Sequence, residues 1–450
     1  MNQEQQIQIA IAESSSAGWN VSRIAFFVPV AIPFAWIVGV DFVYSILWAV
    51  LALMFVRAVP SRLTTFEASI FFLCVFLFMG LLAGFNISLS GETASTRILS
   101  AVYFIANILA SVYIFGLIYH SSESVYNRSF RSFLAGGTIL FVMCAAFAVL
   151  VFMYAMAVGA FYLEVPTGLG ALYSGNLPGI AERSQAAVLA APDWGFGFPL
   201  PRPIIFAPWY TAGAMLAAIS GLLAMGYVAI NNKSHVVEVA IDLLTLFVVM
   251  LVLTRSLTAL YVIAFVICAF VFKDKRRMLL IYIASLAVIP ALVLGMIEFI
   301  SEFRSYSTES RLTSYTLGLE TALNLSPAFG IGYKPMVEFL SIPIGSHSSF
   351  ISSLIRGGVL ALAAFVFAFY LTPAFLWSKV FSPKSYRFVG NKRLLAIIFR
   401  FQVIVSGWLF FQEFDTASVV TLYLFCTLAF FWKYVLNNIE PVNFKIERRS

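Results

Sequence analysis

The chain has 450 residues, of which 61% are hydrophobic and 11% are charged, and its mean hydropathy is +0.93. Soluble domains average about 25% charged residues, so this composition excludes a soluble protein and indicates a chain that uses a lipid bilayer as solvent. The net charge of +7 fits the excess of Lys and Arg in cytoplasmic loops, not a nucleic-acid partner. We expect one integral membrane domain over residues 1–450, built as an all-α polytopic bundle among membrane lipids.

Apolar runs of about the 20 residues that a membrane-spanning helix needs recur along the whole chain. The second run is short and is separated from the first only by Asp41, so these two predict a tight hairpin or two tilted halves. We predict about twelve spans, at 24–40, 42–56, 66–85, 98–119, 133–160, 211–230, 236–253, 257–272, 278–300, 358–376, 394–411 and 418–435.

The distribution of Lys and Arg predicts how these spans are oriented. If the N-terminus is cytoplasmic and the spans alternate, most of the 28 basic residues fall in short cytoplasmic segments. The positive-inside rule favours this arrangement, so we expect both termini in the cytoplasm. Two segments on the opposite side are too long to be turns, and long ordered loops are usually functional. These predicted outer loops are 161–210 and 301–357.

His347 is the only one of the three histidines that this orientation puts outside. It lies in the stretch GSHSSF, where Ser346 or Ser348 could cap a helix that lies on the membrane surface. The N-terminus of a helix disfavours an imidazolium, so His347 there would be a neutral base. The alternative is that this histidine only caps or orders its loop.

Several outer arginines form a second signal. Arg202 precedes a span, Arg255 lies between two spans with almost no loop, and Arg311 follows the potential helix caps Thr308 and Ser310. A guanidinium group can grip two phosphate oxygens at once, so such residues at the outer leaflet suit a lipid diphosphate. The alternative is that they extend to lipid head groups without a further role. Weaker candidates of the same kind are Arg183 and Arg356.

Acidic residues give little indication of a metal site. The chain has no Asp-x-Asp, HExxH or phosphate-binding GxxxxGK[ST] motif, so we expect no metal and no cofactor. Glu238 and Asp242 stand four residues apart in one predicted span. They could form a proton or cation site, or could simply be solvated at the end of their helix.

The second outer loop resembles the signature of the O-antigen ligase and O-antigen polymerase superfamily. In that pattern an Arg-led helix is followed by a P-x-x-G-x-G turn, a His-Asn or His-Ser loop and a helix that ends in Gly. Upstream, RPIIFAPW and TRSLTAL resemble two further Arg motifs of the family, with Trp209 in place of Asn and with Thr254 and Ser256 in place of Ser and Gly. The residues that carry the main motif here are Arg311, Pro327, Gly330, Gly332, His347, Gly357 and Gly358.

This resemblance implies a GT-C-like, metal-independent membrane glycosyltransferase of the bacterial inner membrane, with its active site on the periplasmic face. The donor would be an oligosaccharide on undecaprenyl diphosphate, and the acceptor a glycan or the lipid A-core. A chain-length regulator protein would be a further partner. His347 would be the catalytic base, and Arg202, Arg255 and Arg311 would bind the diphosphate. Further candidates for substrate binding are Arg183, Arg356, Tyr315 and Lys334.

Three functions stay open at this point. GSHSSF resembles the polymerase members, which favours polymerisation of O-antigen or exopolysaccharide repeat units. The alternative within the family is an O-antigen ligase that transfers the glycan to the lipopolysaccharide core. An alternative from another class is a secondary transporter or flippase of lipid-linked sugars, for which Glu238 and Asp242 would be the polar residues inside the membrane.

Overall fold

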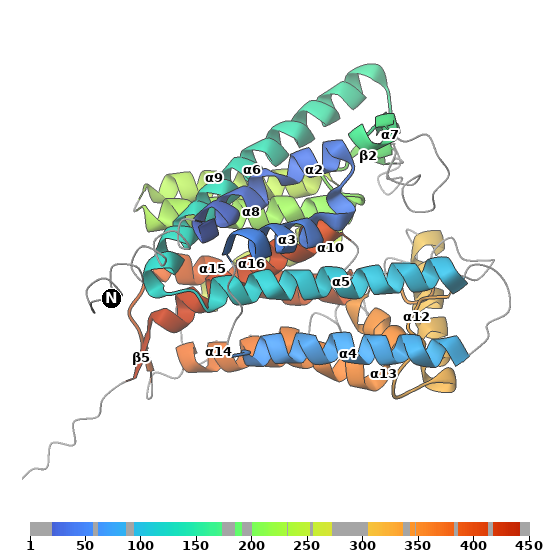
Figure 1. Ribbon diagram of the computed structural model, residues 1–450. Coiled ribbons are helices and arrows are strands. Elements are labelled where there is room, and N and C mark those ends of the chain that lie inside the picture. Colours follow the sequence, from blue (N-terminus) through green and yellow to red (C-terminus); the bar gives the residue numbers. More distant parts are fainter. Residues whose placement is uncertain are drawn as a thin grey trace, which may run out of the picture.

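The computed structural model is a bundle of long, roughly parallel helices (Figure 1). Seven helical segments of the described part are long and apolar enough to cross a membrane. An eighth, Asn20–Val30 with α2 (Ile32–Val38), passes the same test although it bends by 58° just before Pro33. The described residues are 20–56, 62–86, 94–172, 185–190, 200–231, 233–252, 255–271, 305–335, 343–346, 348–381, 386–412 and 417–441.

The helices follow one another in chain order with few other elements between them. After α2 they are η1 (Asp41–Val43), α3 (Tyr44–Val56), α4 (Thr65–Asn86), α5 (Ala94–Tyr119), α6 (Glu123–Val158), α7 (Gly168–Leu172), α8 (Tyr210–Ile230), α9 (His235–Leu251), α10 (Arg255–Val271), α12 (Ser305–Leu325), α13 (Ser349–Val366), the π-helix η4 (Phe367–Leu371), α14 (Thr372–Phe381), α15 (Lys392–Phe411) and α16 (Ser418–Asn437).

Every predicted apolar run that the structure describes coincides with a helix. Run 278–300 lies outside the described residues. Three of the runs form helices that are shorter than the seven long segments. Helix α3 has 13 residues, and α9 and α10 have 17 each. The total of about twelve spans therefore stays a prediction, whereas a multi-pass helical membrane protein is supported.

Helices α8 and α16 form the centre of the bundle. In each, 89% of the most apolar 18-residue stretch is buried inside the protein. Small residues allow this, because α8 is rich in Ala and Gly and its neighbours can approach its backbone closely. A Cβ atom at Gly221 would overlap the side chain of Thr245 on α9. By contrast, only 33% of the corresponding stretch of α6 is buried inside the protein, so most of its apolar side chains are free to contact lipid.

The described parts of both predicted outer loops lie at the same end of the bundle, where Figure 1 shows α7, β2 and α12 on the right. The first loop contains an antiparallel sheet in the order β1 (Leu163–Pro166), β2 (Gln185–Ala190) and β3 (Arg202–Pro203). A second small sheet, β4 (Tyr386–Phe388) with β5 (Ile439–Pro441), lies at the opposite end. The fold is thus mostly helical, as predicted, and the two short sheets pair backbone groups where the chain leaves the helices.

Helix α13 is interrupted at Gly358, whose φ of 68° and ψ of −166° are not helical. The break releases the carbonyl groups of Ile355 and Arg356, which accept hydrogen bonds from the backbone N–H groups of Ile331 (2.8 Å) and Gly332 (2.9 Å). In return, the N–H group of Val359 donates to the carbonyl of Pro327 at 2.9 Å. The segment 327–332 therefore completes the hydrogen bonding of a broken helix inside the bundle.

This segment also lies against the backbone of α4. A Cβ atom at Gly80 would overlap the carbonyl oxygens of Arg356 and Phe329, and one at Gly84 would overlap that of Ile331. Gly330 and Gly332 themselves have φ values of 68° and 78°, which side chains other than that of Gly rarely tolerate. The spacing P-x-x-G-x-G is thus required by backbone contacts on two sides.

We predict that Gly80→Ala destabilises the protein by about 1–3 kcal/mol, because the new methyl group overlaps backbone atoms that cannot move independently. The measurement is thermal unfolding of the purified protein in detergent. Gly226→Ala in α8 is the matched control, since its methyl group would meet only the side-chain ends of Leu134 and Leu394, at 3.2 and 3.3 Å. Equal unfolding temperatures for the two variants would contradict this account of the 327–332 segment.

Candidate functional site

A small second core joins the parts of the chain that carry the histidine motif. It is separate from the main core and packs α12 against the 330–332 turn, the 343–346 segment and the first half of α13. These elements come from distant parts of the second loop, and burial of their apolar side chains holds them together. The buried residues of this core are Ala322, Ile331, Ile344, Leu354 and Ile355.

The segment before the histidine is fixed to α12 at Ser314, which is fully buried. The N–H group of Gly345 donates to the hydroxyl of Ser314 at 2.8 Å, and the φ of Gly345 is 71°. On the other side, Ser348 is the N-cap of α13 and accepts a hydrogen bond from Ile351 N at 3.5 Å. His347 itself lies outside the described residues, but the residues on both of its sides are buried and held.

Helix α12 begins at Ser305, earlier than the predicted caps Thr308 and Ser310, so Arg311 lies in its second turn. Arg311 precedes Ser314 by three residues, and residues at that spacing share one side of a helix. The turn of α12 that carries Arg311 therefore adjoins the turn that holds the histidine loop. The side chain of Arg311 is outside the described part, whereas that of Tyr315 is half-buried.

Arg202 lies in β3 at the end of the first loop and only 8% of it is exposed. Its guanidinium carbon is 3.8 Å from the ring centroid of Tyr210, the first residue of α8. Residues 203–207, which follow it, are also buried, and Phe206 adopts a φ of 45°, an unusual value for a residue with a side chain. Such backbone strain is often found at functional sites, because the surrounding packing must enforce it.

Gln412 connects these two regions and was not predicted from the sequence. It is the C-cap of α15 and 4% exposed. Its side-chain oxygen accepts a hydrogen bond from the hydroxyl of Thr211 (3.3 Å), next to Tyr210, and its backbone carbonyl accepts one from the hydroxyl of Ser349 (2.7 Å). Through Gln412, the start of α8 and the start of α13 are held together, so Arg202 and the histidine loop belong to one end of the bundle.

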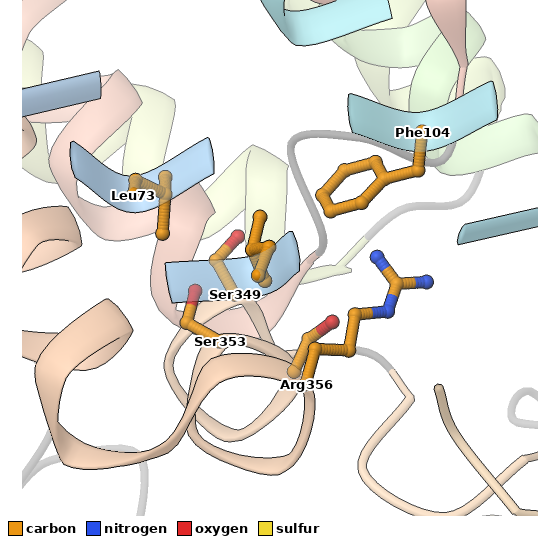
Figure 2. Close-up of a pocket in the computed structure, with 7 residues that line it drawn as sticks. Leu73, Phe104, Ser349, Ser353 and Arg356 are labelled. Carbon is orange, nitrogen blue, oxygen red and sulfur yellow. The ribbon is translucent and has the colours of Figure 1, made fainter. Parts of the chain in front are cut away.

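Arg356 lines a pocket between α13, α4 and α5 (Figure 2). Its guanidinium carbon lies 4.2 Å from the ring centroid of Phe104 on α5. Figure 2 shows the hydroxyl groups of Ser349 and Ser353 on the same side of α13, toward Leu73 of α4. The pocket therefore combines a positive charge and hydroxyl groups with apolar walls.

Arg255 is the first residue of α10, and its side chain lies outside the described part. Helix α10 and the adjacent α9 are fixed to α15 by a buried ion pair. The guanidinium of Arg400 donates two hydrogen bonds to Asp242, at 2.8 and 2.5 Å, and the hydroxyl of Tyr261 donates to the same carboxylate at 2.6 Å. One turn earlier on α9, Glu238 accepts a hydrogen bond from Arg393 at 3.1 Å.

The sequence left two interpretations of the acidic residues, a proton or cation site and solvated residues at a helix end, and these ion pairs fit neither of them. Glu238 and Asp242 are neither solvated nor arranged as an open cation site, because each is bound by an arginine of α15. A sequence signal for this pairing does exist. The carboxylates are four residues apart and the arginines seven apart, so each pair shares one face of its helix. The signal does not say which two helices are neighbours.

The remaining predicted residues add little geometry. Arg183 lies outside the described residues. Lys334 is half-buried just after the 327–332 segment, next to Tyr333, whose pKa is raised by burial. Tyr333 therefore stays a protonated hydrogen-bond donor at neutral pH. Within the described ranges, no three His, Cys, Asp or Glu side chains gather in the manner of a metal site.

The fold and this end of the bundle together define a multi-pass membrane protein with a partly buried, arginine-containing site. Residues 240–366 match the family model described as O-antigen ligase, and this match supports the resemblance of the chain to the superfamily of O-antigen ligases and polymerases. The matched range contains Arg255, Arg311, His347 and Arg356, whereas Arg202 lies upstream of it. No curated protein and no solved structure resembles the chain closely enough to count as a match.

The family match confirms the resemblance stated from the sequence. It supports a function of the O-antigen ligase or polymerase type, which is that of a glycosyltransferase acting on lipid-linked glycan and an acceptor. The match does not extend to the first outer loop. The case for Arg202 therefore depends on its geometry beside Tyr210 and on the connection through Gln412.

We predict that Arg400→Met destabilises the protein by about 3–5 kcal/mol, because it leaves the carboxylate of Asp242 buried without its counter-ion. The double variant Asp242→Asn/Arg400→Met should recover most of this loss, since the amide oxygen still accepts from Tyr261. Thermal unfolding in detergent measures both. Arg131→Gln, at an exposed arginine of α6, is the control. If Arg400→Met unfolds at the temperature of the unchanged protein, the ion pair does not anchor α9 and α10.

Proposed function

We propose that this protein is a membrane glycosyltransferase of the bacterial inner membrane that polymerises O-antigen or exopolysaccharide repeat units at the periplasmic face. In this reaction an acceptor hydroxyl attacks the anomeric carbon of a glycan on undecaprenyl diphosphate. The bond between that carbon and the diphosphate oxygen breaks, and the lipid diphosphate leaves. The donor is the lipid-linked oligosaccharide, and the acceptor is a second lipid-linked repeat unit. A chain-length regulator protein is a further partner.

The leaving diphosphate needs fixed positive charge, because negative charge grows on its oxygen as the bond breaks. We assign this role to Arg202, Arg255 and Arg311, with Arg183, Tyr315 and Lys334 as further contacts to the substrate. The observation that carries the proposal is the connection from Arg202 through Tyr210 and Thr211 to Gln412 and then to Ser349. It supports one shared site for an arginine of the first loop and the histidine loop of the second.

We assign the catalytic base to His347. It takes the proton of the acceptor hydroxyl as the new glycosidic bond forms. The N-terminus of α13 follows directly, and its positive end favours a neutral imidazole. Burial of Ser346 and Ser348 on both sides, to 7% and 3% exposed, supports a fixed position for this part of the loop. The reaction as proposed uses no metal.

An O-antigen ligase is the second candidate, and the description of the matching family model favours it. A ligase would transfer the same donor glycan to the lipid A-core of lipopolysaccharide. The arginines and the histidine would keep their roles, because donor, leaving group and bond formation are unchanged. Only the acceptor side of the site would differ.

We predict that His347→Ala lowers the rate of glycan transfer by 10²–10⁴-fold, the usual contribution of a general base. Binding of the lipid donor should change little, because the base contacts the acceptor. The measurement is product formation from purified protein and lipid-linked repeat units, with donor binding measured separately. His235→Ala is the matched control, at an exposed histidine at the start of α9. Full activity of His347→Ala would exclude the role of base.

The same assay separates the two acceptors. A ladder of products from lipid-linked repeat units alone indicates a polymerase, whereas transfer that requires added lipid A-core indicates a ligase. We expect the ladder, and we expect a chelator to leave its rate unchanged. Movement of lipid-linked sugar across vesicles without any glycan transfer would contradict both candidates and favour a flippase.

A further inference from the structure

Trp209 is a large aromatic residue that the fold leaves exposed at the start of the central helix α8. Its exposed fraction is 55%, whereas the other tryptophans in the described ranges are buried or half-buried. Burial of such a ring stabilises a protein, so the fold forgoes this gain at Trp209. The tryptophans with which it is compared are Trp36, Trp48, Trp377, Trp408 and Trp432.

Trp209 also occupies a position at which its side chain does not help the helix. It is the N-cap residue of α8, with a φ of −134° and a ψ of 144°, and it makes no side-chain cap hydrogen bond. Asn, Asp, Ser and Thr are preferred there, because their short side chains accept a hydrogen bond from the first turn. Residues that break a local rule of folding without a structural gain are expected at functional sites.

An exposed tryptophan at the end of a membrane helix can also anchor that helix at the lipid interface. The position of α8 argues against this role, because residues 212–226 are all buried and the helix has no lipid-facing side over that length. Lipid-facing helices provide such anchors instead. One example is Tyr154 of α6, which is 50% exposed near the end that leads into the first outer loop. The ring of Trp209 therefore lies over the interior of the bundle.

The segment before Trp209 is held rigidly by aromatic packing. Phe206, which has the unusual φ of 45°, contacts the ring of Trp36 with 5.8 Å between ring centroids and that of Phe147 with 4.7 Å. The same segment begins at the buried Arg202. A rigid support of this kind is what a residue that recognises a substrate requires.

Trp209 adjoins the arginine to which the proposed function assigns the diphosphate. The guanidinium carbon of Arg202 is 3.8 Å from the ring centroid of Tyr210, the residue after Trp209. In the donor, the first sugar is joined directly to a diphosphate oxygen. A diphosphate held at Arg202 therefore brings the first sugar to the part of the chain that carries Trp209.

A sugar ring matches an exposed tryptophan because the ring has two kinds of surface. Its hydroxyl groups are polar, whereas the C–H groups of a pyranose gather on a face and make an apolar patch. An indole ring is a flat apolar surface that can cover this patch while the hydroxyls stay hydrated. A rigid aromatic side chain also loses little conformational entropy when it binds.

We propose that Trp209 is a substrate-binding residue whose ring stacks on the first sugar of the donor, the sugar attached to the diphosphate. The inference rests on the proposed function and goes beyond the donor class. It names the sugar of the glycan that is recognised, the residue that recognises it, and the surface of the sugar that is contacted.

The first test measures binding without any reaction. Purified full-length protein in lipid nanodiscs is titrated with undecaprenyl diphosphate alone and with the same lipid carrying a single glucose or a single galactose. We expect one sugar or both to strengthen binding to the unchanged protein by about tenfold, as stacking of one nucleobase on an aromatic side chain does elsewhere. Trp209→Ala should lose this gain but bind the sugar-free lipid as before, and Trp209→Phe should keep part of the gain.

Two further variants separate recognition from a structural or anchoring role. Trp209→Asn introduces a preferred N-cap residue, so it should unfold at a higher temperature than the unchanged protein and still lose the gain from the sugar. Tyr154→Ala is the matched control at an exposed aromatic residue and should keep the gain.

Three results of this test would overturn the proposal. The first is that neither sugar strengthens binding to the unchanged protein. The second is that the gain persists in a folded Trp209→Ala or Trp209→Asn variant. The third is that these variants bind the sugar-free lipid and the sugar-carrying lipids with an equal loss of affinity, which would indicate a structural or anchoring role.

The second test uses glycan transfer to separate this inference from the proposed function. Trp209→Ala should raise the KM for the lipid-linked donor with little change in kcat, because the ring binds the sugar before the reaction as well as during it. If no transfer occurs but Trp209→Ala still loses the gain from the sugar, the proposed function fails and the sugar site stands. If transfer occurs and Trp209→Ala keeps both the gain and the KM, the sugar site fails alone.

Discussion

Hydrogen bonding of backbone groups in a medium without water is the constraint on which this structure depends. A helix that breaks inside a membrane must find other partners for the groups it releases. Here the break at Gly358 is completed by the N–H and C=O groups of 327–332. The loop can reach the break only because Gly80 and Gly84 leave the backbone of α4 open to it. These hydrogen bonds thus fix the 327–332 segment on α13, and the two glycines let α4 pack closely against both.

The candidate site follows from this arrangement. The first half of α13 is held at its far end by the 327–332 segment and at its near end by the bond from Ser349 to Gln412. The histidine loop is fixed at both ends, because Gly345 before it is hydrogen-bonded to Ser314 of α12 and Ser348 after it caps α13. Rigid support on each side is what a base and its substrate require, because a small displacement of the reacting groups costs much of the rate.

Much of the fold could be predicted from the sequence, since apolar runs of sufficient length specify spans whatever their neighbours are. The sequence also predicts the helix cap at Ser348, and it places Gly330, Gly332 and Gly358 in a motif, where the structure shows that they have positive φ values. The partners of those residues were not visible, because Gly80 and Gly84 lie about 250 residues away and belong to a run that reads simply as a span. The small sheet around Arg202 was not predicted because its strands have only four, six and two residues, too few to show a clear pattern.

The buried arginines show why residue type alone did not assign function. Arg400 is a charge inside a span and by that criterion resembles a functional residue. Its two hydrogen bonds to Asp242 make it part of the scaffold that holds α9 and α10. Arg356 also lies in a span, but its neighbours on one side are serines that line a pocket. What separates the two is the environment of the guanidinium. A carboxylate on a neighbouring helix neutralises the charge of Arg400 within the protein, whereas the guanidinium of Arg356 lies over the ring of Phe104 beside serine hydroxyls.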